Sequence, residues 1–121
     1  MNSLLKHVGT YDGNYLDSFI PENPKNFQVL IYITVGPSDK PGGHDYTLSV
    51  CTPAWLECRT RKGDAVWGRH FLVVNAFDAE KIKKEIEAMI LRCDRGNWAD
   101  SSVVLSRYLA WEYEDYNGLP K

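Results

Sequence analysis

The segment FQVLIYITV at residues 27–35 is the strongest indication of the fold, because it contains the longest unbroken apolar run of the chain. Valine or isoleucine occupies every odd-numbered position from 29 to 35. Side chains of a β-strand point alternately to its two faces, so this pattern predicts a strand with one strongly apolar face. Leu30 and Tyr32 make the other face apolar as well. The stretch therefore predicts a central strand whose second face is at least partly covered.

A second strand follows after a turn. Prolines and glycines, which suit bends better than ladders, fill much of residues 36–43. The next segment, 46–51, alternates cleanly, with Tyr46, Leu48 and Val50 on the inner face. Two alternating segments joined by a turn predict an antiparallel hairpin.

Further strands and a loop surround this hairpin. Residues 3–11 predict a first strand, and residues 66–77 predict a third long strand. Between the first strand and the hairpin, residues 12–26 have the Gly, Asn, Asp and Pro content of a surface loop. We expect Phe19 and Ile20 to anchor that loop to the body of the protein.

Capping residues predict the helices. Thr52 as N-cap and Pro53 at the first helical position predict a short helical turn over 52–57, followed by a polar loop at 59–64. Asp78 is placed to cap a longer helix, and Asn97, with Asp100 three residues on, begins another after Gly96. The longer helix carries an apolar stripe at three- and four-residue steps, and the last helix directs three apolar residues to the core. These residues are Ile82, Ile86, Met89, Ile90 and Cys93, then Trp98, Leu105 and Leu109.

The alternation at 110–116 predicts a half-buried closing strand, with Trp111 and Tyr113 on one face and Glu112 and Glu114 on the other. The predicted fold is α+β: a mainly antiparallel sheet of four to five strands with two C-terminal-half helices packed on one face. A single domain at 1–121 is expected from the length.

Composition narrows the function. The chain is 44% hydrophobic and 25% charged, as ordinary globular proteins are. A net charge of −2 disfavours bulk binding of nucleic acid, and no apolar run approaches the ~20 residues that span a membrane. The first residues have two leucines where a signal peptide needs an apolar stretch of about 7–15 residues. We therefore expect a cytosolic protein that binds neither nucleic acid nor membranes.

The residue types that usually carry chemistry are sparse. Cys51, Cys58 and Cys93 form an odd set without a C-x-x-C pair, which is typical of reduced thiols, and we expect Cys51 and Cys93 in the core. Cys58 stands beside two arginines that could lower its pKa. The sequence predicts no metal site, no cofactor and no catalytic residue.

Histidines offer the remaining catalytic possibilities. His44 and Asp45 follow two glycines in a predicted turn, and His70 alternates with apolar residues. A hydrogen-bonded histidine at a strand end explains His70 better than a general base does. A small hydrolase that uses His44 and Asp45, or His70, remains the enzymatic alternative.

Aromatic residues and charge favour protein binding. The core is expected to hold three of the four tryptophans, Trp55, Trp67, Trp98 and Trp111. One or two of them, with Tyr113 or Tyr116, could anchor an interface, where such residues are enriched. Residues 112–115 contain three carboxylates and no base, so they form either a solvated strand face or a surface that steers a basic partner.

Three segments in order resemble the bacterial immunity protein 8 family: CTPAWL at 51–56, WGRHFLVV at 67–74 and AWEYEDY at 110–116. The resemblance extends from about residue 3 to residue 116. It implies a non-catalytic cytosolic inhibitor that binds and neutralises the toxin domain encoded beside it in polymorphic or contact-dependent toxin systems. We predict that the toxin-binding residues are those on the outward face of the last strand, Glu112 and Glu114, together with Asp115 and Tyr116.

Another reading of the same observations is a small interaction module with an unrelated protein partner, which could be a second copy of itself. Fold does not determine function, so the chemistry of the toxin and the oligomeric state stay open at this point.

Overall fold

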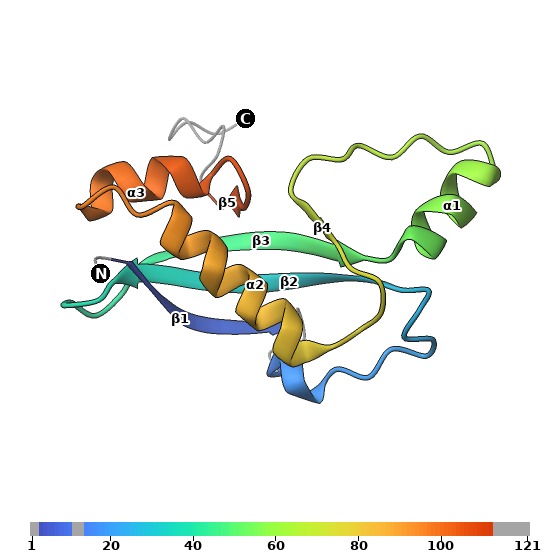
Figure 1. Ribbon diagram of the computed structural model, residues 1–121, viewed down its shortest axis with the longest axis horizontal. Helices are drawn as coiled ribbons and strands as arrows, with labels where there is room; N and C mark the ends of the chain where they lie inside the picture. Colours follow the sequence, from blue (N-terminus) through green and yellow to red (C-terminus); the bar gives the residue numbers. More distant parts are fainter. Residues whose placement is uncertain (1–2, 11–13, 113–121) are drawn as a thin grey trace, which may run out of the picture.

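The computed structural model of the chain describes residues 3–10 and 14–112, whose strands form one sheet in the order β1-β2-β3-β4, with β5 also paired to β3 (Figure 1). Neighbouring strands are antiparallel except β3 and β4. The strands are β1 (Ser3–Thr10), β2 (Gln28–Pro37), β3 (His44–Cys51), β4 (Phe71–Val73) and β5 (Ala110–Trp111). The helices are η1 (Leu16–Ser18, a 3₁₀ turn), α1 (Pro53–Arg61), α2 (Ala79–Arg92) and α3 (Trp98–Leu105).

Strand β2 is the central strand that the sequence predicts, flanked by β1 and β3. Its valines and isoleucines at odd positions are buried, and they meet the inward side chains of β3 across the ladder. The second face of β2 differs from the prediction. Leu30 is 38% exposed and Tyr32 is 42% exposed, because the buried faces of α2 and α3 belong to the core on the other side of the sheet.

Helix α2 crosses the inner face of the sheet (Figure 1). Its N-cap is Asp78, whose carboxylate accepts a hydrogen bond from the amide of Lys81 at 3.2 Å, as predicted. The predicted apolar stripe, Ile82 to Cys93, is buried throughout. Such a stripe supplies most of the stability of a helix through packing rather than through intrinsic propensity.

Helix α3 begins at the predicted cap. The side chain of Asn97 accepts a hydrogen bond from the amide of Asp100 at 2.9 Å and donates one to its carboxylate at 3.0 Å. Leu105 and Leu109 are fully buried, and Trp98 packs half-buried against the core. The α+β fold with two C-terminal-half helices on one face is therefore confirmed.

The prediction of a third long strand at 66–77 is wrong. Strand β4 has three residues and runs parallel to β3, facing residues 49–51. The chain reaches it by a crossover that contains α1. The free edge of β3 is shared, because β5 pairs with Tyr46 and Thr47 and helix α1 begins just after Cys51. Only a short length of that edge is therefore left for β4.

Helix α1 is longer than predicted and includes the start of the expected polar loop. Thr52 caps it, accepting hydrogen bonds from the amides of Trp55 at 3.4 Å and Phe27 at 3.2 Å. An ion pair between Glu57 and Arg61, one turn apart, extends the helix past residue 57. None of its nine residues is buried, so α1 projects from the sheet instead of covering it (Figure 1).

One of the two predicted loop anchors is wrong. Phe19 packs edge-on against Phe77, with ring centroids 5.3 Å apart, but Ile20 is 88% exposed. The second anchor is Leu16 on η1, which is almost completely buried. The 3₁₀ turn rotates Leu16 inward, and that turn cannot be recognised from a composition rich in polar residues.

Candidate partner-binding site

Glu112 lies where β5 ends beside β3. The ladder pairs Tyr46 with Trp111, and the amide of Glu112 donates to the carbonyl of Asp45 at 3.1 Å, which continues the pairing by one residue. Glu112 is therefore opposite Asp45. Since Tyr46 points into the core, Asp45 is on the face of the sheet away from α2. The other predicted binding residues, Glu114, Asp115 and Tyr116, lie outside the described residues.

We call this side of the sheet the open sheet face, and it combines exposed apolar side chains with carboxylates. Cross-strand pairing places Tyr32 beside Thr47 and Thr34 beside Asp45. The hydroxyl of Thr34 donates to the Asp45 carboxylate at 2.7 Å, which holds that charge in place. Aromatic and apolar groups rimmed by charges are typical of protein-binding surfaces. The residues of this face used below are Leu30, Tyr32, Thr34, Asp45, Thr47 and Glu112.

His44 and Asp45 do not form a catalytic pair, because neighbouring residues of a strand point to opposite faces. The His44 ring lies on the inner face, with its centroid 5.2 Å from that of Trp98 and 5.3 Å from that of Trp111. Asp45 instead bonds Thr34 on the open sheet face. Both residues begin β3 and do not lie in the turn that the glycines predict.

His70 precedes β4 in a left-handed backbone conformation, with φ of 60°. One ring nitrogen lies 3.2 Å from the carbonyl oxygen of Ser106, so the side chain ties the start of β4 to the end of α3. This contact confirms the prediction of a hydrogen-bonded histidine beside a strand.

Two of the three cysteines are buried, and the third is half-buried. Cys51 and Cys93 are buried as predicted, and burial raises the pKa of both thiols. Cys58 is half-buried on α1, where the side-chain amide of Asn26 lies 3.7 Å from its sulfur. Within residues 3–10 and 14–112, no three His, Cys, Asp or Glu side chains gather as metal ligands would. In the same ranges no helix is long and apolar enough to cross a membrane.

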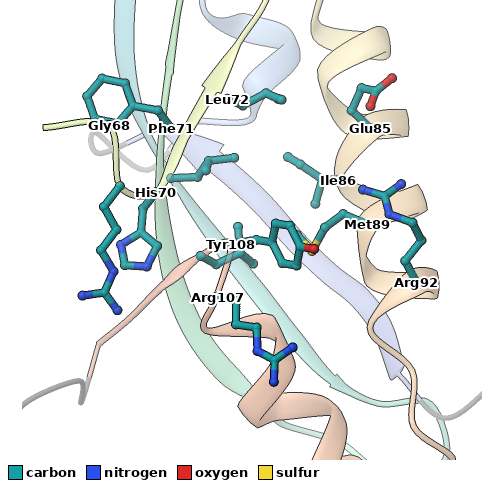
Figure 2. Close-up of a pocket in the computed structure, with 13 residues that line it drawn as sticks. Gly68, His70, Phe71, Leu72, Glu85, Ile86, Met89, Arg92, Arg107 and Tyr108 are labelled. Atoms are coloured by element: carbon teal, nitrogen blue, oxygen red, sulfur yellow. The ribbon is translucent and has the colours of Figure 1, made fainter.

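A groove of about 280 Å³ that no sequence pattern predicts lies on the helix side of the sheet. We call it the arginine groove, because Arg69, Arg92 and Arg107 line it from three separate segments. Figure 2 shows Met89 and Arg92 on α2 along one side, His70 on the other, and Tyr108 between them. No local motif could reveal this site, since its arginines are far apart in the sequence.

Charge accumulates beneath this groove. Cys93 follows the last turn of α2, and burial raises the pKa of its thiol, while the nearby Arg95, Arg92 and Arg107 act in the opposite direction. These arginines come from two segments, the end of α2 and the turn after α3.

The tryptophans are distributed between the core and the surface differently from the prediction. Trp98 and Trp111 pack against the core, but Trp55 lies on α1 with the Arg59 guanidinium 5.5 Å from its ring centroid. Trp67 is 90% exposed, immediately before the groove residue Gly68. The core therefore holds two tryptophans, not three, because α1 and the segment after it project from the sheet.

Comparison with known proteins gives one match. The model of the family described as Immunity protein 8 matches residues 3–116 of the chain. No curated protein and no solved structure matches it. The matched range includes every strand and helix of the described structure.

Proposed function

The chain belongs to the immunity protein 8 family, and from this premise we propose that it binds and neutralises a bacterial toxin domain. The family match carries the proposal, because it spans all the described strands and helices. We further propose that the protein acts in the cytosol of the cell that produces the toxin. The cognate toxin would be encoded by an adjacent gene of a polymorphic or contact-dependent growth inhibition system.

The proposed mechanism is coverage of the toxin, without catalysis. A stable complex of this kind buries about 1,600 Å² in total. We propose that the toxin docks on the open sheet face and on Glu112, Glu114, Asp115 and Tyr116. The exposed Leu30 and Tyr32 would contribute contact area, while the carboxylates would steer a basic toxin surface toward the face.

The described side chains favour binding over turnover. His44 is enclosed by aromatic rings, Asp45 is on the opposite face, and His70 contacts a backbone carbonyl. General acid–base chemistry requires its two groups to converge on one substrate, and these groups are turned apart or already bonded.

Co-expression with the toxin domain encoded by the adjacent gene tests the proposal. We expect cells to survive only when the immunity protein is present, and the two chains to elute together in size-exclusion chromatography. Cells that die despite its expression, with no complex on the column, would refute the function.

The proposed surface has its own test within that experiment. The triple variant Glu112→Lys, Glu114→Lys and Asp115→Lys should lose most of its protection, because its charges repel a basic toxin. Glu22→Lys, a change of an exposed carboxylate in the loop before β2, is the control and should protect fully. Full protection by the triple variant would move the toxin-binding surface elsewhere and leave the function intact.

A further inference from the structure

We infer that the arginine groove binds a short acidic segment of a partner protein, in which carboxylates flank an apolar side chain. This surface is on the helix side of the sheet, away from the open sheet face. The inference is therefore independent of the toxin-binding surface proposed above, and it adds a second interaction site to the protein.

The floor of the groove is apolar. Leu48, Ile86, Met89 and Leu109 line it, and all four belong to the buried core. A volume of about 280 Å³ is at the small end of the range of ligand pockets, which begins at roughly 300 Å³. The space suits an apolar side chain of a docked segment, in the way that interface pockets receive anchor residues.

The rim is basic. Among the residues that the structure describes, Arg69, Arg92, Arg107 and the carboxylate of Glu85 line the groove. Arg92 and Arg107 are exposed, and neither forms an ion pair with any residue in the part of the chain that the structure describes. A guanidinium group presents a planar set of donors that matches a carboxylate. The rim therefore complements negative charge held next to an apolar group.

The walls of the groove are joined by hydrogen bonds. The amide of Leu109 donates to the carbonyl of Leu105 at 2.9 Å, which shapes the turn that carries Arg107 and Tyr108. The His70 ring connects this turn, through Ser106, to the start of β4. The amide of Ser49 then donates to the carbonyl of His70 at 3.0 Å, which fixes that wall to β3. A site held in this way loses little freedom when it binds.

An acidic peptide fits both halves of the site, whereas other occupants fit one. A free inorganic anion would satisfy the arginines and leave the space above the apolar floor unfilled. A purely apolar segment would fill the floor and leave Arg92 and Arg107 without partners. Carboxylates that flank a leucine side chain satisfy both requirements.

Amide NMR titration of the full-length protein tests the inference without any toxin. The probe is the capped peptide acetyl-Glu-Asp-Leu-Asp-Glu-amide, and its control is acetyl-Gln-Asn-Leu-Asn-Gln-amide. We expect the acidic peptide to shift the amides of Ile86, Met89 and Leu109 saturably, and the neutral peptide to bind at least about tenfold more weakly. Added salt should weaken the acidic peptide alone.

Charge-reversal variants locate the binding. Arg92→Glu combined with Arg107→Glu should weaken the acidic peptide by about tenfold or more, and both side chains are exposed, so the amide spectrum should keep its native dispersion. The matched control combines Lys81→Glu with Lys83→Glu, which makes the same charge change at two exposed positions of α2 outside the groove. This control should lose less than half as much binding free energy as the arginine variant.

Several results would overturn the inference. One is the absence of saturable shifts at about 5 mM peptide, where even a millimolar complex would be mostly formed. Equal binding of the neutral peptide, or equal losses in the two double variants, would remove the role of the arginines. If inorganic phosphate shifts the same amide signals with the same affinity, the occupant of the groove would be a small anion. Amide shifts that grow with protein concentration in the absence of peptide would show that the groove binds a second copy of the chain.

Discussion

Asp45 and Glu112 are opposed across the β3–β5 ladder, with the amide of Glu112 bonded to the carbonyl of Asp45 at 3.1 Å. Like charges placed opposite each other in a sheet are destabilising. Thr34 donates to Asp45, and no basic side chain among residues 3–10 and 14–112 forms an ion pair with Glu112. A basic surface docked on the open sheet face would relieve the repulsion. The same two carboxylates would therefore destabilise the free protein and favour the proposed complex.

Glu112→Gln is expected to separate stability from binding. Removing one of two opposed charges should raise the free energy of unfolding by a few tenths of a kcal/mol. The same change should slow association with the cognate toxin several-fold at low salt, because it removes a steering charge. Denaturant unfolding measures the first effect and stopped-flow association the second. Glu22→Gln should change neither; an equal slowing in that control would point to net charge as the cause.

Tyr46 is expected to make stability fall at high pH. Burial, and then the nearby Cys93, raises the pKa of Tyr46 from its ordinary value of 10.0 to about 12. As the pH rises, the unfolded chain therefore loses the Tyr46 proton before the folded protein does. The contribution of Tyr46 to the free energy of unfolding is intact below pH 10 and is lost as the pH rises toward 12. The loss should reach about 3 kcal/mol at most.

Tyr46→Phe isolates this contribution from other groups that titrate in the same range. The variant loses only the long contact of 3.5 Å between the hydroxyl and the Ser102 carbonyl, so it should fold. Its unfolding free energy should fall less steeply between pH 10 and 12 than that of the original chain. Identical slopes in urea unfolding across this range would contradict the burial argument.

Asp78→Ala is expected to lower the free energy of unfolding by about 1 kcal/mol, because it removes the acceptor for the Lys81 amide at the start of α2. Asp78→Ser should retain most of the stability, since serine can accept the same bond. Asp17→Ala, at an exposed carboxylate of η1, serves as the control and should change stability by less than about 0.5 kcal/mol. Chemical denaturation measures all three, and equal losses at both aspartates would reject the capping role.

Alkylation is expected to distinguish the three cysteines. Cys51 and Cys93 are buried and have a raised thiol pKa, so few of their thiolates form and reagents cannot reach them. Cys58 is half-buried on α1 and should react with iodoacetamide first. Mass spectrometry of digested peptides gives the modified fractions, and full denaturation should make all three react. If Cys93 in the folded protein were labelled as fast as Cys58, the packing around the C-terminal end of α2 would have to open readily.

Some of this architecture could be predicted because its causes are local. The alternation at 27–35 and the stripe from Ile82 to Cys93 each fit one repeat of secondary structure, and each buried the predicted face. Asp78 and Asn97 capped their helices as predicted, because a cap bonds amides only two or three residues away. The family resemblance, which the family match at 3–116 confirms, likewise depended on short segments in order.

The order of residues was enough to predict the central hairpin, two capped helices and the helix side of the core, since periodicity and caps act within a few residues. The length of β4, in contrast, depends on the assembled sheet, because β4 and β5 compete for one edge of β3. The tertiary structure also turned His44 and Asp45 to opposite faces, and it brought Arg69, Arg92 and Arg107 to one groove. Edge pairing and the sum of charges depend on distances through space, which the order of residues along the chain does not contain.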